Sequence, residues 1–217
     1  MKNIIQNIRR LFFDNSCTCC GEKASDNLIY LCYNCLDKIV RQKSLNKVGD
    51  TYYIWPYKGE FRKLLLEYKN NSRLALGKII SSLIEEEIFK VVYEEDIDYI
   101  VPIPINFRRE QIRGFNQVEE ILKNLNYSFL KTNRVKNTKK MFKILDKEKR
   151  ENNIKNSFKV DKEFKAKNIL IFDDIITTGA TIDEVKRELI KNGEVNKIVV
   201  FSLSASKTYM NSNKRMC

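Results

Sequence analysis

Apolar residues along this chain form alternating strand-like runs and helix-like stripes. A short continuous apolar run is typical of a strand buried on both faces of a sheet, and apolar residues spaced by three and four are typical of a helix with one buried face. The pattern predicts strands near 97–103, 128–134, 168–174 and 196–202, and helices near 60–68, 74–93, 115–126 and 180–191.

Strands and helices that alternate in this way predict an α/β fold in which helices flank a mostly parallel central sheet. An aromatic strand and turn over 47–58 lead into it, after a helical apolar stripe within residues 4–12 and a group of cysteines. We therefore predict a small N-terminal module over 1–46 and a main domain over 47–217. Residues 136–157 have little apolar periodicity, which predicts a long loop of the kind that serves as a lid.

The segment 169–183 combines a strand, an acidic pair and a hydroxyl-rich turn. Four apolar residues run into Asp173 and Asp174, and Thr177-Thr178-Gly179-Ala180-Thr181 then opens a helical pattern. Ligands of open α/β sheets bind at the carboxyl ends of strands, and N–H groups that open a helix attract anions. Gly179 has no Cβ to keep backbone from a phosphate. The turn is therefore a candidate phosphate site, although a merely acidic and threonine-rich surface turn would show the same pattern.

The two carboxylates would repel that phosphate, so they must contact another part of the ligand. Hydrogen bonds to the vicinal hydroxyls of a ribose, or contact with Mg²⁺ through water, would suit them.

A second segment, 99–117, carries arginines after an apolar run. Pro102 and Pro104 end the strand and stiffen the loop behind it, because proline lacks a ladder donor and keeps its predecessor extended. Arg108, Arg109 and Arg113 would then sit on a stiff loop as a pyrophosphate grip, since guanidinium groups bind phosphate bidentately. The alternative is that these arginines are ordinary loop residues whose charges are solvated and bind no ligand. The sequence from Asn116 to Glu119 predicts a capping box at the next helix.

The cysteines form two C-x2-C pairs. Cys17 with Cys20 and Cys32 with Cys35 are separated by eleven residues, and four thiolates satisfy tetrahedral Zn²⁺. We predict a structural zinc site, with a redox pair or a decayed zinc module as alternatives. Spacing favours Cys17 with Cys20, which leaves Cys19 as an outward thiol. We assign no role to Cys217.

Composition indicates one ordinary domain with a small appendage. The chain has 217 residues, of which 43% are hydrophobic and 31% charged, so it can bury a sizeable core. No apolar run approaches the length of a membrane span, and the basic start lacks the continuous apolar stretch of a signal peptide. These features predict a cytoplasmic protein.

The formal net charge of +12 is concentrated in one segment, since residues 131–150 hold nine basic and two acidic side chains. Such a segment favours polyanionic partners, namely pyrophosphate groups or nucleic acid. A chain-wide bias toward Lys, Asn and Ile would raise the charge without such a function. The candidate nucleic-acid contacts are Arg134, Lys139, Lys140 and Arg150, with Phe142 and Phe158 as candidate stacking groups.

The segment 169–183 resembles the phosphoribosyl-pyrophosphate (PRPP) loop of type I phosphoribosyltransferases, in which an apolar strand and an acidic pair precede T-T-G-x-T. The resemblance implies that fold, Mg²⁺ bound with PRPP, and a catalytic set of Asp173, Asp174 and Arg113. It also implies that the two aspartates hold the ribose hydroxyls and that the turn holds the 5′-phosphate. The implied PRPP-binding residues are Pro102, Arg108, Arg109, Arg113, Asp173, Asp174, Thr177, Thr178, Gly179, Ala180 and Thr181.

Further motifs resemble the ComF family of competence-associated proteins, whose members join such a domain to an N-terminal cysteine module. These are V-P-x-P at 101–104, R-G-F-N-Q at 113–117, and 61–65 ahead of Tyr68 and Lys69. The remaining matches are Tyr57, Arg134, Thr138, Leu145, Arg150, Asn153 and Phe158. Met141 departs from the family pattern.

The sequence supports three functional hypotheses. The first is an Mg²⁺-dependent phosphoribosyltransferase whose acceptor is unidentified, because residues 202–217 are short and polar and offer no evident nucleobase pocket. The second, implied by the family resemblance, is a competence protein that binds single-stranded DNA and works with the DNA-uptake machinery. The third is a scaffold for protein partners. The oligomeric state stays open.

Overall fold

The computed structural model of the chain describes residues 16–26, 28–70, 73–134, 158–159 and 164–213. Its centre is a five-stranded sheet in the order β1-β2-β7-β6-β3. The strands are β1 (Asn46–Val48), β2 (Thr51–Pro56), β3 (Tyr99–Pro102), β6 (Phe164–Ile176) and β7 (Gly193–Ala205). β1 is antiparallel to β2, and every other pair in this sheet is parallel. The predicted α/β fold with a mostly parallel sheet is confirmed.

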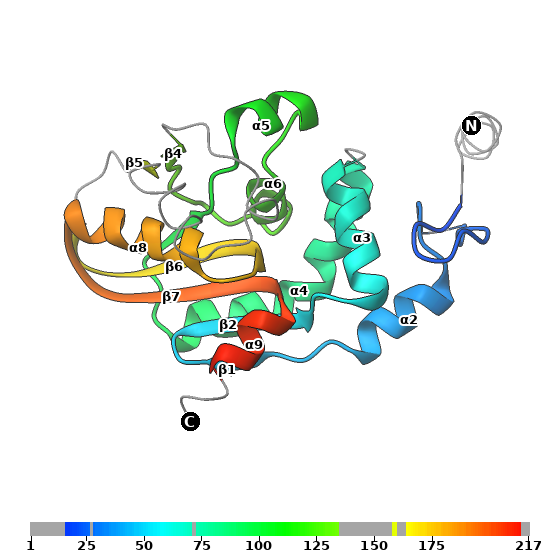
Figure 1. The fold of residues 1–217 in the computed structure, drawn as a ribbon, viewed down its shortest axis with the longest axis horizontal. Coiled ribbons are helices and arrows are strands. Elements are labelled where there is room, and N and C mark those ends of the chain that lie inside the picture. The colour runs from blue at the N-terminus through cyan, green and yellow to red at the C-terminus, as the bar shows by residue number, and fades with distance from the viewer. Residues whose placement is uncertain (1–15, 27, 71–72, 135–157, 160–163, 214–217) are drawn as a thin grey trace.

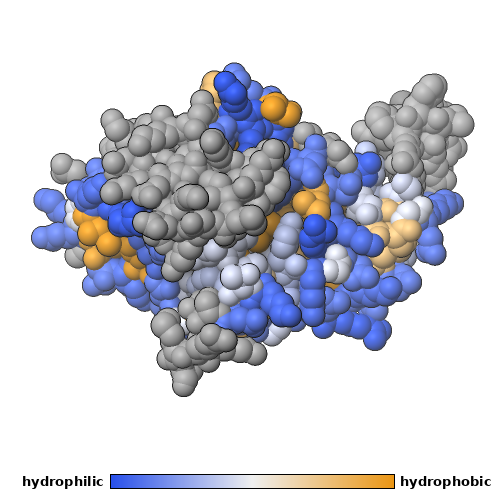
Figure 2. All heavy atoms as spheres, in the orientation of Figure 1, coloured by the Kyte–Doolittle hydropathy of each residue, from blue (hydrophilic) through white to orange (hydrophobic). Residues whose placement is uncertain are grey.

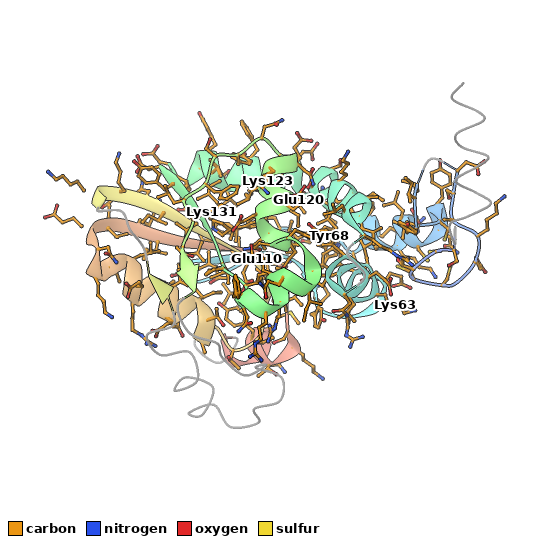
Figure 3. All side chains as sticks on the ribbon, turned by 90° about the horizontal axis from the view of Figure 1, so that it is seen from above. Lys63, Tyr68, Glu110, Glu120, Lys123 and Lys131 are labelled. Atoms are coloured by element: carbon orange, nitrogen blue, oxygen red, sulfur yellow. The ribbon has the colours of Figure 1, made fainter. Side chains whose placement is uncertain are left out.

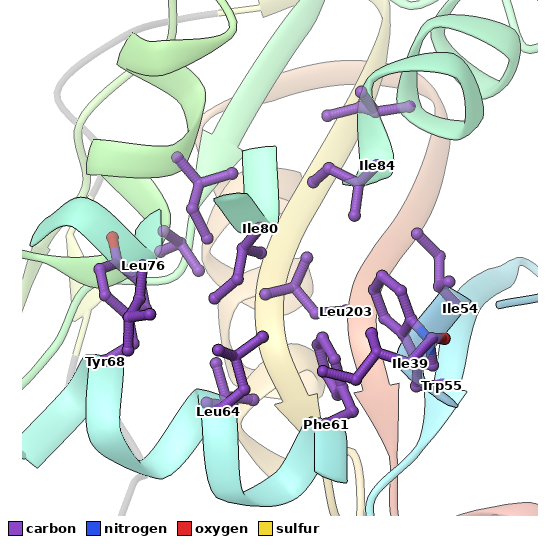
Figure 4. Packing of buried hydrophobic residues seen from close by; sticks show 14 of the residues in the cluster. Ile39, Ile54, Trp55, Phe61, Leu64, Tyr68, Leu76, Ile80, Ile84 and Leu203 are labelled. Carbon is purple, nitrogen blue, oxygen red and sulfur yellow. The ribbon is translucent and has the colours of Figure 1, made fainter. Parts of the chain in front are cut away.

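Helices cover both faces of the sheet (Figure 1). Because successive side chains of a strand point to opposite faces, β6 contributes to two separate cores. Ile169 and Ile171 pack with residues of α8 (Ala180–Lys191) on one face. Leu170 and Phe172 belong to the larger core on the other face, under α3 (Gly59–Asn70), α4 (Leu74–Glu94) and α6 (Gln117–Asn124). Figure 4 shows this larger core from close by.

The four predicted helices are therefore present as α3, α4, α6 and α8. The expected cap of α6 is also present: the Asn116 side chain accepts from the Val118 amide over 3.1 Å and donates to Glu119 Oε1 over 3.2 Å. Three helices were not predicted, namely α2 (Tyr33–Arg41), α5 (Phe107–Arg113) and α9 (Lys207–Asn213).

The predicted strand over 128–134 is wrong in extent and placement. Only β4 (Asn133–Arg134) is extended there, and it pairs with β5 (Phe158–Lys159) in a separate two-stranded sheet. Leu130 donates one backbone hydrogen bond to Ile100 at the edge strand β3, without a continuing ladder. Lys131 is exposed directly after it, so the short apolar run does not extend into a buried strand.

The central strands are longer than predicted. β6 pairs with β7 as far as Ile176 opposite Ala205, so the acidic pair lies within the last part of the strand and not beyond its end. The predicted helical stripe within residues 4–12 and the predicted loop 136–157 lie outside the described residues. None of the helices in the described ranges has the length and apolarity needed to cross a membrane.

Candidate functional site

The adjacent aspartates of β6 have unequal surroundings. Asp174 is only 5% exposed, and its Oδ2 atom lies 2.7 Å from the Lys69 Nζ atom and accepts a hydrogen bond from the Gln117 side-chain amide. Its backbone N–H donates to Asp173 Oδ1 over 2.8 Å. Asp174 is thus held by groups from α3 and α6, whereas Asp173 is half-buried and lines a hollow beside the adjoining turn.

The environment of Asp173 disfavours its charged form. Burial and the neighbouring charge of Asp174 raise the pKa of Asp173 to about 7, against the opposing charge of Lys69. A carboxyl group of this kind is partly protonated at neutral pH and gains from a cation or a hydroxyl donor that stabilises its ionised form.

The turn 177–181 has the geometry of an anion site. Gly179 has φ +82°, a left-handed conformation that glycine adopts without strain, and α8 begins at the next residue. The cap residue of α8 is Gly179, which has no side chain to accept from the first N–H groups of the helix, and such groups can bind a ligand or water. The Thr178 hydroxyl is buried and has no hydrogen-bond partner among the described residues.

A small hollow adjoins this turn. Its empty volume, including space open to solvent, is about 190 Å³. Its lining residues are Asp173, Ile175, Ile176, Thr177, Gly179, Ala180, Thr181 and Ile182. The predicted phosphate turn and one predicted carboxylate therefore share one concave surface.

Sequence reasoning missed the contacts that Ser206 and α9 make with this turn. The Ser206 N–H donates to the Ile176 carbonyl over 2.8 Å, and the Ser206 hydroxyl donates to the Thr177 carbonyl over 2.9 Å. The Tyr209 ring lies 3.7 Å from the position that a Cβ on Gly179 would take, and its hydroxyl donates to Thr51 Oγ1 over 3.0 Å. The only sequence signal was an aromatic residue shortly after the last predicted strand.

The arginines lie on the short helix α5 and not on the stiff loop that we expected. The Asn106 side chain accepts a hydrogen bond from the Arg108 amide over 3.0 Å and so caps this helix. We predicted a loop from the two upstream prolines, which give no sign of this cap. Arg109 and Arg113 are one helical turn apart and half-buried, while Arg108 is exposed. Burial lowers the pKa of both half-buried guanidinium groups, and the charge of Asp174 opposes this shift, so both lie near the acidic pair.

A polar chain connects α5, α6, β6 and α3. Arg113 donates to Gln117 Oε1, and Gln117 in turn donates to Asp174. Pro102 lies beside this chain, because it pairs in register with Phe172, the residue before Asp173. The outer side of α5 leaves Phe107 61% and Ile112 87% exposed, and Figure 2 shows orange, apolar atoms at the top of the molecule, where α5 lies in Figure 1.

Of the candidate nucleic-acid residues, Arg134 lies in β4. Lys139, Lys140, Phe142 and Arg150 lie outside the described residues. The structure therefore tests the placement of Arg134 but not that of the other four.

The four predicted metal ligands converge. The Sγ atoms of Cys17, Cys20, Cys32 and Cys35 all lie within 4.8 Å of one another, and those of Cys20 and Cys32 are 3.7 Å apart. Sulfur atoms at about 2.3 Å from one tetrahedral zinc would be separated by about 3.8 Å, so the cluster has a suitable size. The prediction of an outward Cys19 is wrong: this thiol is 5% exposed and donates to the Glu60 carbonyl of α3 over 3.4 Å. C-x2-C spacing selects the ligands but does not show which neighbouring helix buries the remaining thiol.

Together these features define an α/β protein with a threonine- and glycine-containing turn between β6 and α8 and a four-cysteine cluster in the N-terminal part of the chain. No protein-family model matches the chain. It is 31% identical to competence protein ComFC of Streptococcus pneumoniae over 161 residues, which cover 69% of this chain and 66% of that protein. It is 26% identical to DNA utilization protein YhgH of Escherichia coli over 186 residues, covering 82% and 78% respectively.

The chain belongs to the ComF/YhgH family of competence proteins. Among solved structures, it is similar to the adenine phosphoribosyltransferase of Leishmania tarentolae, with a TM-score of 0.41 and 13% identity over 76% of this chain and 96% of that one.

Proposed function

We propose that this protein binds PRPP, or a closely related sugar phosphate, together with Mg²⁺ at the turn 177–181, and that it does so in the service of DNA uptake. The observation that carries the proposal is the buried, unpartnered Thr178 hydroxyl beside the left-handed Gly179 at the start of α8. A buried hydroxyl without a partner costs free energy, and a phosphate oxygen would remove that cost.

The surrounding groups suit the rest of such a ligand. The first N–H groups of α8 and the Thr178 hydroxyl would hold the 5′-phosphate. Asp173 lines the hollow beside this turn and would accept hydrogen bonds from the ribose diol or contact Mg²⁺ through water. Arg109 and Arg113 would neutralise the pyrophosphate group, whereas the exposed Arg108 is less well placed.

The reaction that fits this arrangement is displacement of pyrophosphate from the ribose, with an acceptor still to be identified. Bound Mg²⁺ would supply charge neutralisation at the leaving pyrophosphate. The protein's part is to hold the ribose through Asp173 and to stabilise developing negative charge through Arg113, so the chemistry needs no histidine, and the chain has none. Binding without transfer would use the same contacts, and therefore binding is the primary proposal and enzymatic activity a second step.

We also propose that the four-cysteine cluster holds a structural zinc ion. Cys17, Cys20, Cys32 and Cys35 would fill all four positions of a tetrahedral ion and leave none for a substrate. In the cytoplasm, which is the location we predict, thiols remain reduced and available as metal ligands. The division into a module over 1–46 and a domain over 47–217 stays a prediction.

Isothermal titration calorimetry with PRPP and Mg²⁺ tests the binding proposal. Thr178→Val should weaken binding about tenfold, because it removes one charge-assisted hydrogen bond without changing side-chain volume. Thr132→Val is a matched control, since the Thr132 hydroxyl is also buried without a partner in the described ranges but lies outside the turn. Absence of PRPP binding to the unmodified protein at millimolar concentration would contradict the proposal.

Single-stranded DNA is a second candidate ligand, favoured by the net charge of +12 and by relatives named for competence and DNA utilization. Fluorescence anisotropy with a labelled single-stranded oligonucleotide should then rise on titration, with an affinity that falls steeply as salt increases. An unchanged anisotropy at low salt would exclude this candidate. A scaffold role is less well supported, because it assigns no use to the Thr178 hydroxyl.

A further inference from the structure

One end of α3 contacts the cysteine cluster. The Lys63 Nζ atom donates to the Cys19 carbonyl over 2.6 Å, and the Cys19 thiol donates to the Glu60 carbonyl over 3.4 Å. Cys19 lies between Cys17 and Cys20, so the loop that brings these two candidate metal ligands together is itself attached to α3. Figure 3 shows Lys63 on the side of α3 that faces this module.

The other end of α3 contacts the sugar-phosphate site. Lys69 Nζ lies 2.7 Å from Asp174 Oδ2, and the Tyr68 hydroxyl donates to the Gln117 carbonyl over 2.9 Å. Gln117 also donates to the same carboxylate, so two groups positioned by α3 converge on Asp174. Figure 3 shows Tyr68 on the side of α3 that faces α6.

Between these two ends, α3 is packed tightly. Phe61, Leu64, Leu65 and Tyr68 are all buried in the larger core, and the Phe61 ring stacks on that of Trp55 with centroids 4.0 Å apart (Figure 4). Protein interiors are close-packed and transmit displacement, so a helix held along one whole side moves as a unit. A shift at Glu60 and Lys63 should therefore reach Lys69.

We propose that Lys69 is a positioning residue for the sugar-phosphate site, and that metal occupancy of the four-cysteine cluster acts on this site through α3. The proposal rests on the proposed PRPP function for its consequence, but its structural part is independent of any ligand. A bound ion would fix the loop 17–20, and with it both contacts between Cys19 and α3. Without the ion, those contacts loosen and the Lys69–Asp174 pair loses its fixed geometry.

Asp174 transmits the effect to the ligand. Its backbone N–H donates to Asp173 Oδ1 over 2.8 Å, so the position of Asp174 also sets the orientation of the carboxylate that faces the hollow. Groups that orient a ligand-binding residue are worth about tenfold or more in affinity. The cysteine cluster would thereby make sugar-phosphate binding depend on metal supply or thiol oxidation.

Hydrogen–deuterium exchange on the full chain tests the coupling without a ligand. Zinc-loaded and zinc-stripped protein are compared in peptides covering 64–70 and 169–176, and stripping should speed exchange in both. Lys63→Met should speed exchange there even with zinc bound, because it removes one contact with the cysteine loop while leaving every thiolate intact. Lys90→Met on α4 is the control and should change neither peptide, since Lys90 is exposed and pairs only with Glu94 among the described residues.

Calorimetry with PRPP and Mg²⁺ tests the consequence. The stripped protein, dialysed free of chelator, and Lys63→Met should each bind about tenfold more weakly than the loaded protein. Lys69→Met should weaken binding at least as much, and Lys69→Arg should restore most of it because it restores the cation. A purely structural role of Lys69 would predict loss of folding without such a rescue.

The two experiments separate the two proposals. If stripping speeds exchange but the loaded protein does not bind PRPP, the coupling stands and the proposed ligand is wrong. If PRPP binds equally well with and without zinc, and exchange over 64–70 and 169–176 is unaffected, the coupling is wrong and the ligand proposal stands.

Discussion

Lys69 Nζ lies 2.7 Å from Asp174 Oδ2, and this ion pair makes two consecutive aspartates chemically different. Asp174 is satisfied inside the protein, whereas Asp173 lines the hollow beside the turn 177–181. The acidic pair therefore divides into one residue that anchors the strand and one that faces the hollow.

Substitution of the two aspartates should separate stability from binding. Asp174→Asn leaves the Lys69 ammonium without its buried partner and should lower the free energy of unfolding by about 3 kcal/mol. Asp173→Asn should not lower stability at neutral pH, because the fold disfavours the ionised form that this substitution removes, but it should weaken PRPP–Mg²⁺ binding at least tenfold. Urea denaturation and calorimetry measure the two effects, and equal loss of stability in both variants would contradict the distinction.

The affinity for PRPP–Mg²⁺ should rise with pH between about pH 6 and pH 8, because Asp173, with a pKa of about 7, must ionise to serve the ligand. The charges that set this pKa are Asp174 on the same strand and Lys69 on α3, with Arg109 and Arg113 facing Asp174 from α5.

Stability of the free protein should show the opposite trend. The folded pKa of Asp173 exceeds its ordinary value of 3.8, so the stabilisation from its protonated form is complete below that value and is lost as pH rises through about 7. Asp173→Asn should abolish both trends in calorimetry and in urea denaturation, and a pH profile that persists in this variant would assign the titration to another group.

Acid should destabilise the folded protein by protonating the Glu95 carboxylate. Lys47, Tyr52 and Lys197 hydrogen-bond this carboxylate and lower its pKa to about 2. The stabilisation is present above the ordinary pKa of 4.5 and is lost as pH falls from there toward 2. Glu95→Gln should flatten the stability profile over that range in thermal denaturation. Asp37→Asn, which removes an exposed pair with Arg41, serves as the control and should keep it.

Gly179→Ala should damage the phosphate turn through its backbone. A left-handed φ of +82° costs an alanine about 1–2 kcal/mol, so the turn should shift and PRPP affinity should fall. Gly49→Ala is a matched control, because Gly49 also has a positive φ and open space around its Cβ position but lies between β1 and β2. Loss of stability in both variants with loss of binding in the first alone is the expected outcome, measured by denaturation and calorimetry.

Serine substitutions should distinguish the cysteines that bind zinc from Cys19, which is packed in the core. Cys20→Ser should abolish stoichiometric zinc binding, because it removes one of the four converging thiols. Cys19→Ser should retain a full equivalent of zinc but lower stability by about 1 kcal/mol, since it buries a hydroxyl where a weakly polar thiol was packed. A colorimetric zinc-release assay distinguishes them, and zinc loss in Cys19→Ser would instead place Cys19 in the ligand set.

The elements that could be predicted from sequence are those whose patterns are local. The strand 168–174 and the helix 180–191 follow from unbroken periodicity, and C-x2-C spacing identified the four converging thiols. The burial of Cys19 and the pairing of Asp174 with Lys69 depend on partners more than forty residues away, which no local pattern reveals. The strand expected over 128–134 failed because its apolar run is short and Lys131 is exposed directly after it. Helix α5 was missed because its start depends on the cap at Asn106 and it buries no residue.

The two hydrogen bonds from Ser206 and the ring of Tyr209 have a practical consequence for handling the protein. These contacts hold the turn 177–181 in place, and they come from residues after β7, not from the strand and helix on either side of the turn. Deletion of the chain from Ser206 onward would remove all of these contacts and leave the strands of the sheet in place, so a folded sample prepared that way should lose the binding proposed for the turn 177–181.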